Sequence, residues 1–256
     1  MTSIQYQWRV TKYNPNDRDK DGYYPLKEEW TCPSEIGKVI NEKEFTLEEY
    51  LQMENAYVDA VMTFLEESGI HSLRILKLSE QTITEEEKES FLYDSGFEDL
   101  GFQEDKLMNK EEISLICRMV LRNFLYCELY LKDKFFVHFG WDYYMYIGSN
   151  VHCSEALKKV SKSGLFVEKM KSPYYVTEDE IIREMVWNKI GEDSVVGEET
   201  VKGIDLDEFR KIFHLSSEHL VIGSFKIEKE HLDFFQKYVR HKIDLKKYEY
   251  SFWSYT

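Results

Sequence analysis

The chain has 256 residues, of which 43% are hydrophobic and 15% aromatic, so it is long enough to bury a sizeable core. Its 48 acidic and 33 basic residues give a formal net charge of −15, which argues against nucleic acid and anionic membranes as partners and favours a basic protein surface. No run approaches 18 apolar residues and no basic patch precedes an apolar run at the N-terminus, so we expect a cytoplasmic protein without a membrane span.

The first half of the chain carries clear signals for strands and helices. Ile4 to Val10 alternates between apolar and polar residues and predicts a first strand. Thr46 and Glu49 form a capping-box pattern, followed by apolar residues at helical spacing as far as Leu65. A strand is expected over residues 73–78, and a second capping-box pattern at residues 84–87 predicts a short helix over residues 85–93.

The middle of the chain combines a continuous apolar run with a strand-rich segment. Residues 110–121 fit a helix or a buried strand, and the spacing of Arg118 and Arg122 favours the helix. Residues 125–131 and 135–139 flank a polar Lys-Asp-Lys turn and predict a hairpin, with a third strand over residues 143–147. A helix over 154–161 and a strand over 165–170 follow. This order predicts an α+β fold in which helices pack on an antiparallel sheet.

The last third of the chain suggests a division into two lobes. Thr177 and Glu180 predict a new helix over 178–189, and the polar, glycine-bearing residues 191–203 fit a linker. We therefore expect a main domain over 1–190 and a small C-terminal α/β lobe over 204–256 with the order helix, strand, helix, strand. A lobe of about fifty residues is marginal on its own, so a single domain is the alternative.

One segment matches the spacing of a calcium-binding loop. Asp17, Asp19, Asp21 and Glu28, with Gly22 between them, place carboxylates where an EF-hand loop needs them. The preceding residues predict a strand rather than a helix, and a polar hairpin loop explains the same residues. Both interpretations remain open from the sequence.

No catalytic signature emerges from the remaining polar residues. The glycine-rich nucleotide-binding patterns and the Gly-x-Ser-x-Gly pattern of hydrolases are absent, and the seven histidines lack metal-ligand spacing. Cys153 and His138 would form a nucleophile–base pair only if folding brought them together. We expect no cofactor, and the sequence does not favour an enzyme.

The segment from Phe135 to Ile147 is the most distinctive part of the chain. On a strand, both faces of residues 135–139 would be apolar, so another element or a partner must cover the second face. Beyond the bend that Gly140 permits, the four residues Trp141, Asp142, Tyr143 and Tyr144 have a composition typical of interface hot spots. We predict that these four residues bind a partner.

Residues 135–147, with Gly164-Leu165-Phe166-Val167-Glu168 and Ser172-Pro173-Tyr174, resemble small cytosolic proteins of low-GC bacteria. The resemblance covers about residues 110–175, and some of these proteins are immunity proteins that neutralise secreted polymorphic toxins. It implies a stoichiometric inhibitor with an acidic, aromatic surface. It carries over no functional residue, because no defining motif of the family is matched.

The leading hypothesis is a non-enzymatic protein-binding protein, most concretely a bacterial immunity or inhibitor protein with a basic partner. Acidic residues would steer the encounter and aromatic residues would anchor the complex. One alternative is a metal-dependent hydrolase or nuclease of unfamiliar type. A further alternative is a phage or mobile-element protein that binds a component of host defence. The sequence does not determine the oligomeric state.

Overall fold

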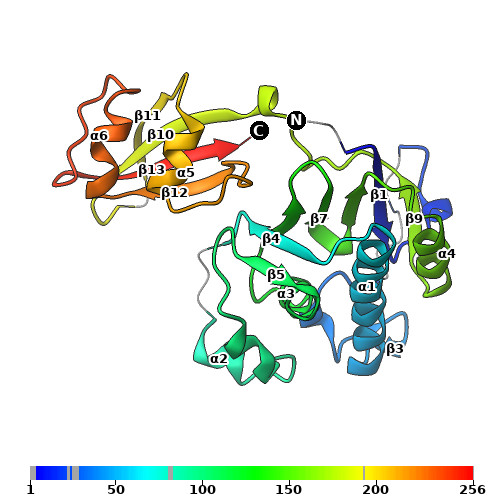
Figure 1. Cartoon of the computed structure of the whole chain (residues 1–256). Coiled ribbons are helices and arrows are strands. Elements are labelled where there is room, and N and C mark those ends of the chain that lie inside the picture. Colours follow the sequence, from blue (N-terminus) through cyan, green and yellow to red (C-terminus); the bar gives the residue numbers. More distant parts are fainter. Residues whose placement is uncertain (1–3, 22–23, 25–28, 80–82, 193, 256) are drawn as a thin grey trace. The chain divides into compact units, whose positions relative to one another are not determined.

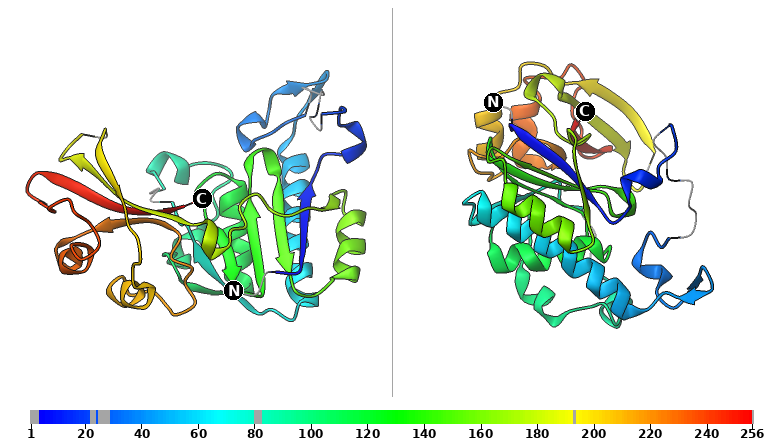
Figure 2. Two further views of the ribbon diagram at one scale, coloured as in Figure 1. Left: turned by 90° about the horizontal axis from the view of Figure 1, so that it is seen from above. Right: turned by 90° about the vertical axis from the view of Figure 1, so that its right-hand side faces the viewer.

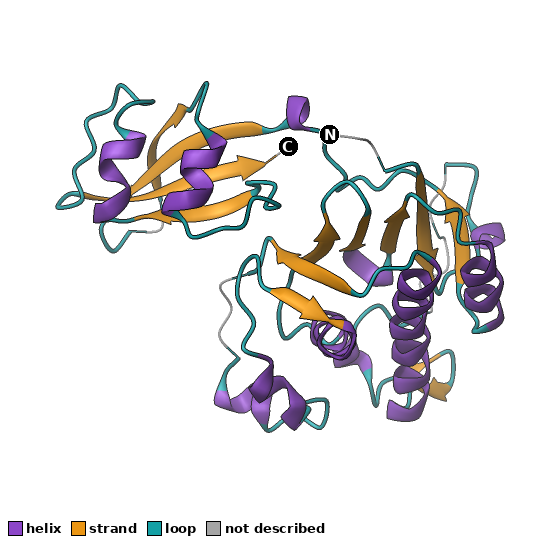
Figure 3. Cartoon of the chain, viewed as in Figure 1, coloured by secondary structure: helices purple, strands orange, loops and turns teal. Residues whose placement is uncertain are grey.

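The computed structural model describes residues 4–21, 24, 29–79, 83–192 and 194–255. The chain divides into two compact units, here called the N-terminal unit (residues 2–175) and the C-terminal unit (residues 176–256). Both consist of an antiparallel sheet with helices packed on it, so the predicted α+β class is confirmed (Figures 1 and 3).

The N-terminal unit is built on a large sheet. Within the described residues this sheet has seven strands, each antiparallel to its neighbours. In spatial order they are β5 (Leu107–Asn109), β4 (Ser72–Leu76), β6 (Glu128–Leu131), β7 (Phe135–Phe139), β8 (Met145–Ser149), β1 (Tyr6–Thr11) and β9 (Phe166–Lys169). The predicted hairpin is β6–β7, in which Leu129 pairs with Val137. The strand predicted next in the chain is β8, shifted by two residues.

Helices cover one face of this sheet (Figure 2). They are α1 (Leu47–Glu67), α3 (Lys110–Leu121) and α4 (Ser154–Lys162). Helix α1 begins at the predicted capping box, where the Thr46 hydroxyl accepts from the Glu49 backbone N–H and the Glu49 carboxylate accepts from the Thr46 N–H. The ambiguous apolar run at residues 110–121 is a helix, as favoured, and Asn109 caps it with Glu112. The remaining short elements of this unit are η1 (Pro15–Asp17), η2 (Pro33–Glu35), β2 (Val39–Ile40), β3 (Lys43–Glu44), α2 (Glu85–Lys88), η3 (Ser95–Leu100) and η4 (Trp141–Tyr143).

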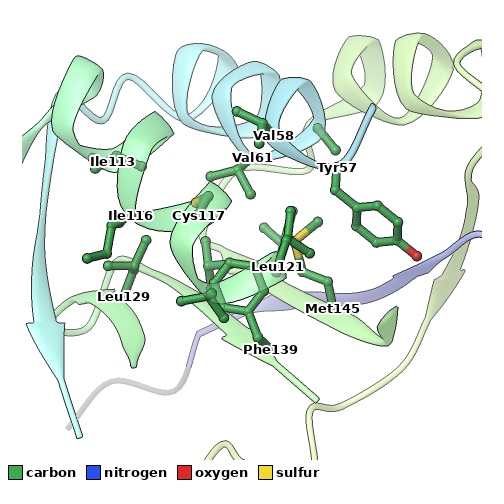
Figure 4. Close-up of a cluster of buried hydrophobic side chains, with 14 of the residues drawn as sticks. Tyr57, Val58, Val61, Ile113, Ile116, Cys117, Leu121, Leu129, Phe139 and Met145 are labelled. Carbon is green, nitrogen blue, oxygen red and sulfur yellow. The ribbon is translucent and has the colours of Figure 1, made fainter. Parts of the chain in front are cut away.

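The core of the N-terminal unit lies between these helices and the sheet. Figure 4 shows the side chains of α1 and α3 packed on the inner face of the central strands. Tyr57 of α1 and Leu121 of α3 lie beside Phe139 of β7 and Met145 of β8, and all four are buried. This part of the core supports the loop between β7 and β8.

The outer face of β7 is covered by the same unit. Phe136 stacks on Tyr175, with 5.2 Å between ring centroids, and the His138 imidazole contacts Ser172. Both Phe136 and His138 are buried. The interpretation of residues 135–139 as a strand covered on both faces is therefore confirmed, and the second cover is the segment 172–175.

The C-terminal unit departs from the prediction at its start. The segment predicted as a helix over residues 178–189 is a short turn, η5 (Glu178–Glu180), followed by strand β10 (Ile182–Lys189). The capping box at Thr177 and Glu180 does form, but it caps only this turn. Met185 and Trp187, two residues apart on β10, pack in the same core, as side chains on one face of a strand do.

The rest of the C-terminal unit forms a sheet with the order β11-β10-β13-β12 among the described residues. Strand β11 (Val195–Thr200) lies inside residues 191–203, so the range predicted as a linker contains a strand paired with β10. The other elements are α5 (Leu206–Ile212), β12 (Gly223–Ile227), η6 (Lys229–His231), α6 (Leu232–Phe235) and β13 (Tyr248–Tyr255). The predicted order of helix, strand, helix and strand over residues 204–256 is found as α5, β12, α6 and β13, and all strand pairs of this unit are antiparallel.

Candidate functional site

The loop that joins β7 to β8, residues 140–144, is called the Trp141 loop. The Gly140 N–H donates to the Tyr144 carbonyl at 2.6 Å, and the Tyr144 N–H donates to the Trp141 carbonyl at 3.1 Å. The backbones of Asp142 and Tyr143 have positive φ angles of 54° and 60°, which residues other than glycine rarely adopt. Such a conformation persists only where surrounding contacts enforce it, and strained loops of this kind concentrate at functional sites.

Tyr143 supplies these contacts from inside the protein. Its hydroxyl donates to the Leu121 carbonyl at 3.0 Å, and its backbone carbonyl accepts from the Tyr57 hydroxyl at 2.6 Å. Tyr143 is only 8% exposed. It therefore anchors the loop to α1 and α3, and only a small part of its side chain is exposed.

Trp141 and Asp142 project from this anchored loop into solvent. Trp141 is 85% exposed, the largest exposed fraction among the exposed apolar side chains of the described residues. Asp142 is also exposed. Tyr144 is half-buried, and its ring lies 5.4 Å from the Arg9 guanidinium carbon and 5.7 Å from the Tyr13 ring. Of the four residues predicted to bind a partner, Trp141 and Asp142 are exposed and Tyr144 is partly exposed.

A cavity of about 540 Å³ opens beside the Trp141 loop and is called the aromatic cavity. Its lining includes the apolar side chains of Val120, Leu121 and Met145. Among the described residues that line it, Asp142 is the one with a charge. Seven of the sixteen described residues in this lining are aromatic: Tyr57, Tyr126, Phe139, Trp141, Tyr143, Tyr144 and Tyr174. A concave apolar site with few polar groups is the usual form of a binding site.

Several residues that line the cavity were not predicted from the sequence. Thr31, Cys32, Asn123 and Tyr174 reach the cavity from segments that are distant in the chain. Tyr174 lies close to Gly140, where a Cβ would be 3.0 Å from the Tyr174 hydroxyl, so the absence of a side chain at Gly140 permits this approach. The Ser172-Pro173-Tyr174 segment was the one available signal. Nothing in the local sequence indicates the other three.

A lysine and two further carboxylates lie near the cavity. The Lys12 ammonium, buried against Tyr13 and Trp30, forms an ion pair of 2.8 Å with Glu29. Burial lowers the pKa of Lys12, and the charge of Glu29 opposes that shift, followed by weaker contributions from Glu35 and Asp142. The carboxylates that act on the Lys12 ammonium are therefore those of Glu29, Glu35 and Asp142.

The predicted calcium loop is only partly within the described residues. Asp17 ends η1, and the Asp19 carboxylate accepts from the Asp21 backbone N–H at 2.9 Å. Gly22 and Glu28 lie outside the described residues. Over the described ranges, no group of three or more His, Cys, Asp or Glu side chains is placed to hold a metal ion. The described part of the loop is organised by local turn contacts.

A buried polar cluster lies on the outer face of the sheet. The His138 Nδ1 is 2.9 Å from the Ser172 Oγ, and its Nε2 is 3.7 Å from a carboxylate oxygen of Glu128. Burial lowers the pKa of His138 to about 4, so the imidazole is a weak base. Ser172 is 2% exposed, and its Oγ also accepts from the Tyr174 N–H. These features suit a structural network rather than a nucleophile and its base.

The pair of Cys153 and His138 does not form. Cys153 belongs to the core on the helix-covered face, where its Sγ is 3.3 Å from the Ser68 Oγ. His138 faces the other side of the sheet with Phe136. The alternation of side chains along β7 turns His138 to the face opposite the helix-covered core that contains Cys153.

Comparison with known proteins finds a similarity within the C-terminal unit. Residues 182–253 match the model of a domain of unknown function (DUF7683). The chain matches no curated protein. Within the described part of the chain, no helix has the length and apolarity that crossing a membrane requires.

Proposed function

We propose that this protein binds another protein through the Trp141 loop and the aromatic cavity. The observation that carries the proposal is a Trp141 side chain that is 85% exposed on a backbone fixed from within by Tyr143. Exposing a large aromatic ring costs solubility, and tryptophans held in this way are frequent hot spots of interfaces. A fixed loop also loses little conformational entropy on binding.

The net charge of −15 favours a partner with a basic surface. Asp142 places one of these charges directly beside Trp141, so long-range steering and short-range anchoring act at the same place. In its most concrete form, the proposal is an immunity or inhibitor protein that neutralises a cognate toxin in the cytoplasm. Support for this form comes from the resemblance over residues 110–175 together with the acidic, aromatic character of the loop.

The test uses the full-length protein, with a tag, to capture a partner from the source cell. The captured protein is then purified, and its 1:1 affinity is measured by calorimetry. Trp141→Ala should weaken the complex at least about 30-fold, as expected for a hot spot. A rise in salt should lower the association rate.

Phe91→Ala is the matched control, because Phe91 is also exposed, at 65%, and does not line the cavity. This variant should bind like the unaltered protein. Equal affinities of Trp141→Ala and the unaltered protein would exclude the Trp141 loop as the binding surface. A toxin that remains active in the presence of the intact protein would exclude the inhibitor form of the proposal.

A further inference from the structure

We infer that the aromatic cavity receives an arginine side chain of the partner protein. This inference rests on the proposed function and specifies the chemistry of the contact. The cavity has room for a side chain, with a volume of about 540 Å³, and it opens beside the exposed Trp141. Its occupant must form favourable contacts with aromatic rings, with apolar side chains and with a single carboxylate.

The lining selects a cation with a long apolar stem. The faces of tryptophan and tyrosine rings attract cations, and the strength of this attraction rises as water is excluded. The Asp142 carboxylate in the lining would attract the positive charge of the cation. Leu121 and Met145 offer apolar surface to the methylene groups of its stem. A neutral apolar side chain would leave Asp142 unpaired, and an acidic side chain would be repelled by it.

The surrounding charges also favour a cation. Two nearby positive groups already have partners: Lys12 pairs with Glu29 at 2.8 Å, and Arg9, which lies over Tyr144, pairs with Glu168 at 2.8 Å. Glu35 and Asp142 act on Lys12 only as weaker, more distant charges. The carboxylate of Asp142 therefore remains available to an incoming cation.

The same unit already holds several cations against aromatic rings, of which Lys12 and Arg9 lie nearest to the cavity residues Asp142 and Tyr144. The Lys12 Nζ lies 4.0 Å from the Tyr13 ring centroid and 4.4 Å from that of Trp30. The Arg9 guanidinium lies over Tyr144, which itself lines the cavity. Arginine suits the aromatic cavity better than lysine does, because a planar guanidinium stacks on an indole while it pairs with a carboxylate.

The test uses the full-length protein and two small probes of the same shape. Nα-acetyl-arginine amide carries the guanidinium, and Nα-acetyl-citrulline amide replaces it with a neutral urea group. Binding is followed through the indole N–H resonance of Trp141, which Trp141→Phe assigns. The arginine probe should give a saturable shift, and the citrulline probe should bind about 10-fold more weakly.

Asp142→Asn should remove most of the difference between the two probes. Asp99→Asn is the control, since Asp99 is exposed and does not line the cavity, and it should preserve the difference. Unchanged resonances outside the cavity show that each variant is folded. Equal binding of the two probes, or no saturable shift with the arginine probe, would overturn the inference. If Trp141→Ala still abolished partner binding in that case, the proposed function would stand without it.

Discussion

The Tyr57 hydroxyl of helix α1 donates a 2.6 Å hydrogen bond to the backbone carbonyl of Tyr143 in the Trp141 loop. The same hydroxyl accepts from the Lys12 backbone N–H at 2.7 Å. One buried phenol thus connects the end of β1, the longest helix of the described residues and the strained loop. The positive φ angles at Asp142 and Tyr143 depend on contacts of this kind.

We predict that Tyr57→Phe destabilises the protein and loosens the Trp141 loop. The substitution leaves the Tyr143 carbonyl and the Lys12 N–H without their partner in a buried place, at a cost of about 1–3 kcal/mol. Urea unfolding measures the loss, and calorimetry with the partner should show weaker binding although Trp141 is intact.

Tyr50→Phe is the control for that substitution. The Tyr50 hydroxyl donates to the Leu121 carbonyl at 3.2 Å, and this carbonyl keeps a second donor, Tyr143, at 3.0 Å. The loss of stability should therefore be smaller. A loss as large in Tyr50→Phe as in Tyr57→Phe would contradict the role assigned to Tyr57.

We predict that Glu54→Gln destabilises the protein strongly. Glu54 is completely buried in α1, and its carboxylate pairs with Arg118 at 2.5 Å and with Arg122 at 2.6 Å. Removing one partner of a buried ion pair leaves uncompensated charge, and the expected loss is about 3–5 kcal/mol. Thermal or urea unfolding measures it.

Glu155→Gln provides the comparison for Glu54→Gln. Glu155 pairs with Lys158 on the surface of α4, where both side chains are well exposed. Water screens this pair, so no measurable change in the unfolding midpoint is expected. If Glu54→Gln shifted the midpoint as little as Glu155→Gln does, the buried pair would not support the packing of α1 on α3.

The sequence predicted elements well where the signal was local. The capping boxes at Thr46 and Thr84 mark the true starts of α1 and α2, because the two hydrogen bonds of a box involve only residues three apart. The third box, at Thr177, formed but did not begin a helix. From Ile182 to Lys189 the chain instead pairs with β11 and β13, and these contacts between residues distant in the sequence determine the state of that segment.

The site was harder to predict because most of its contacts join residues that are distant in the sequence. The bend at Gly140 correctly separated the buried strand from an exposed Trp141, because both features are adjacent in the chain. The burial of Tyr143 depends on Tyr57 and Leu121, which are distant in sequence and come close only after folding. Cys32 and Tyr174 enter the cavity in the same way.

We predict that His138 makes stability depend on pH between about 6.5 and 4. Burial lowers the pKa of His138 to about 4 in the folded protein, against 6.5 for a free histidine. In this window the unfolded chain binds a proton that the folded protein does not, so stability falls as the pH falls. The shift corresponds to about 3 kcal/mol at most.

His138→Gln should flatten this part of the dependence of unfolding free energy on pH. The neighbouring groups Glu128, Lys77 and Ser172 remain in this variant, so any residual slope belongs to them. His71→Gln, at an exposed histidine, should leave the slope as it is. Equal slopes in His138→Gln and the unaltered protein would show that His138 does not titrate as its burial requires.

We predict that Gly197→Ala destabilises the C-terminal unit and that a smaller ring at Trp187 restores part of the loss. Gly197 of β11 lies against the Trp187 ring of β10, and a Cβ at Gly197 would be 2.4 Å from the ring carbon Cζ2. The indole must move, although it stacks on His241 at 4.1 Å between ring centroids. Overpacking of this kind costs about 1–3 kcal/mol.

The double variant Gly197→Ala with Trp187→Phe distinguishes a steric cause from a backbone cause. A phenyl ring lacks the atoms that the new Cβ would meet, so the double variant should be more stable than the sum of the two single losses implies. Urea unfolding of the four proteins gives this coupling energy. Strict additivity would mean that Gly197 is needed for its backbone alone, and that the closeness of Trp187 does not explain the glycine in this strand.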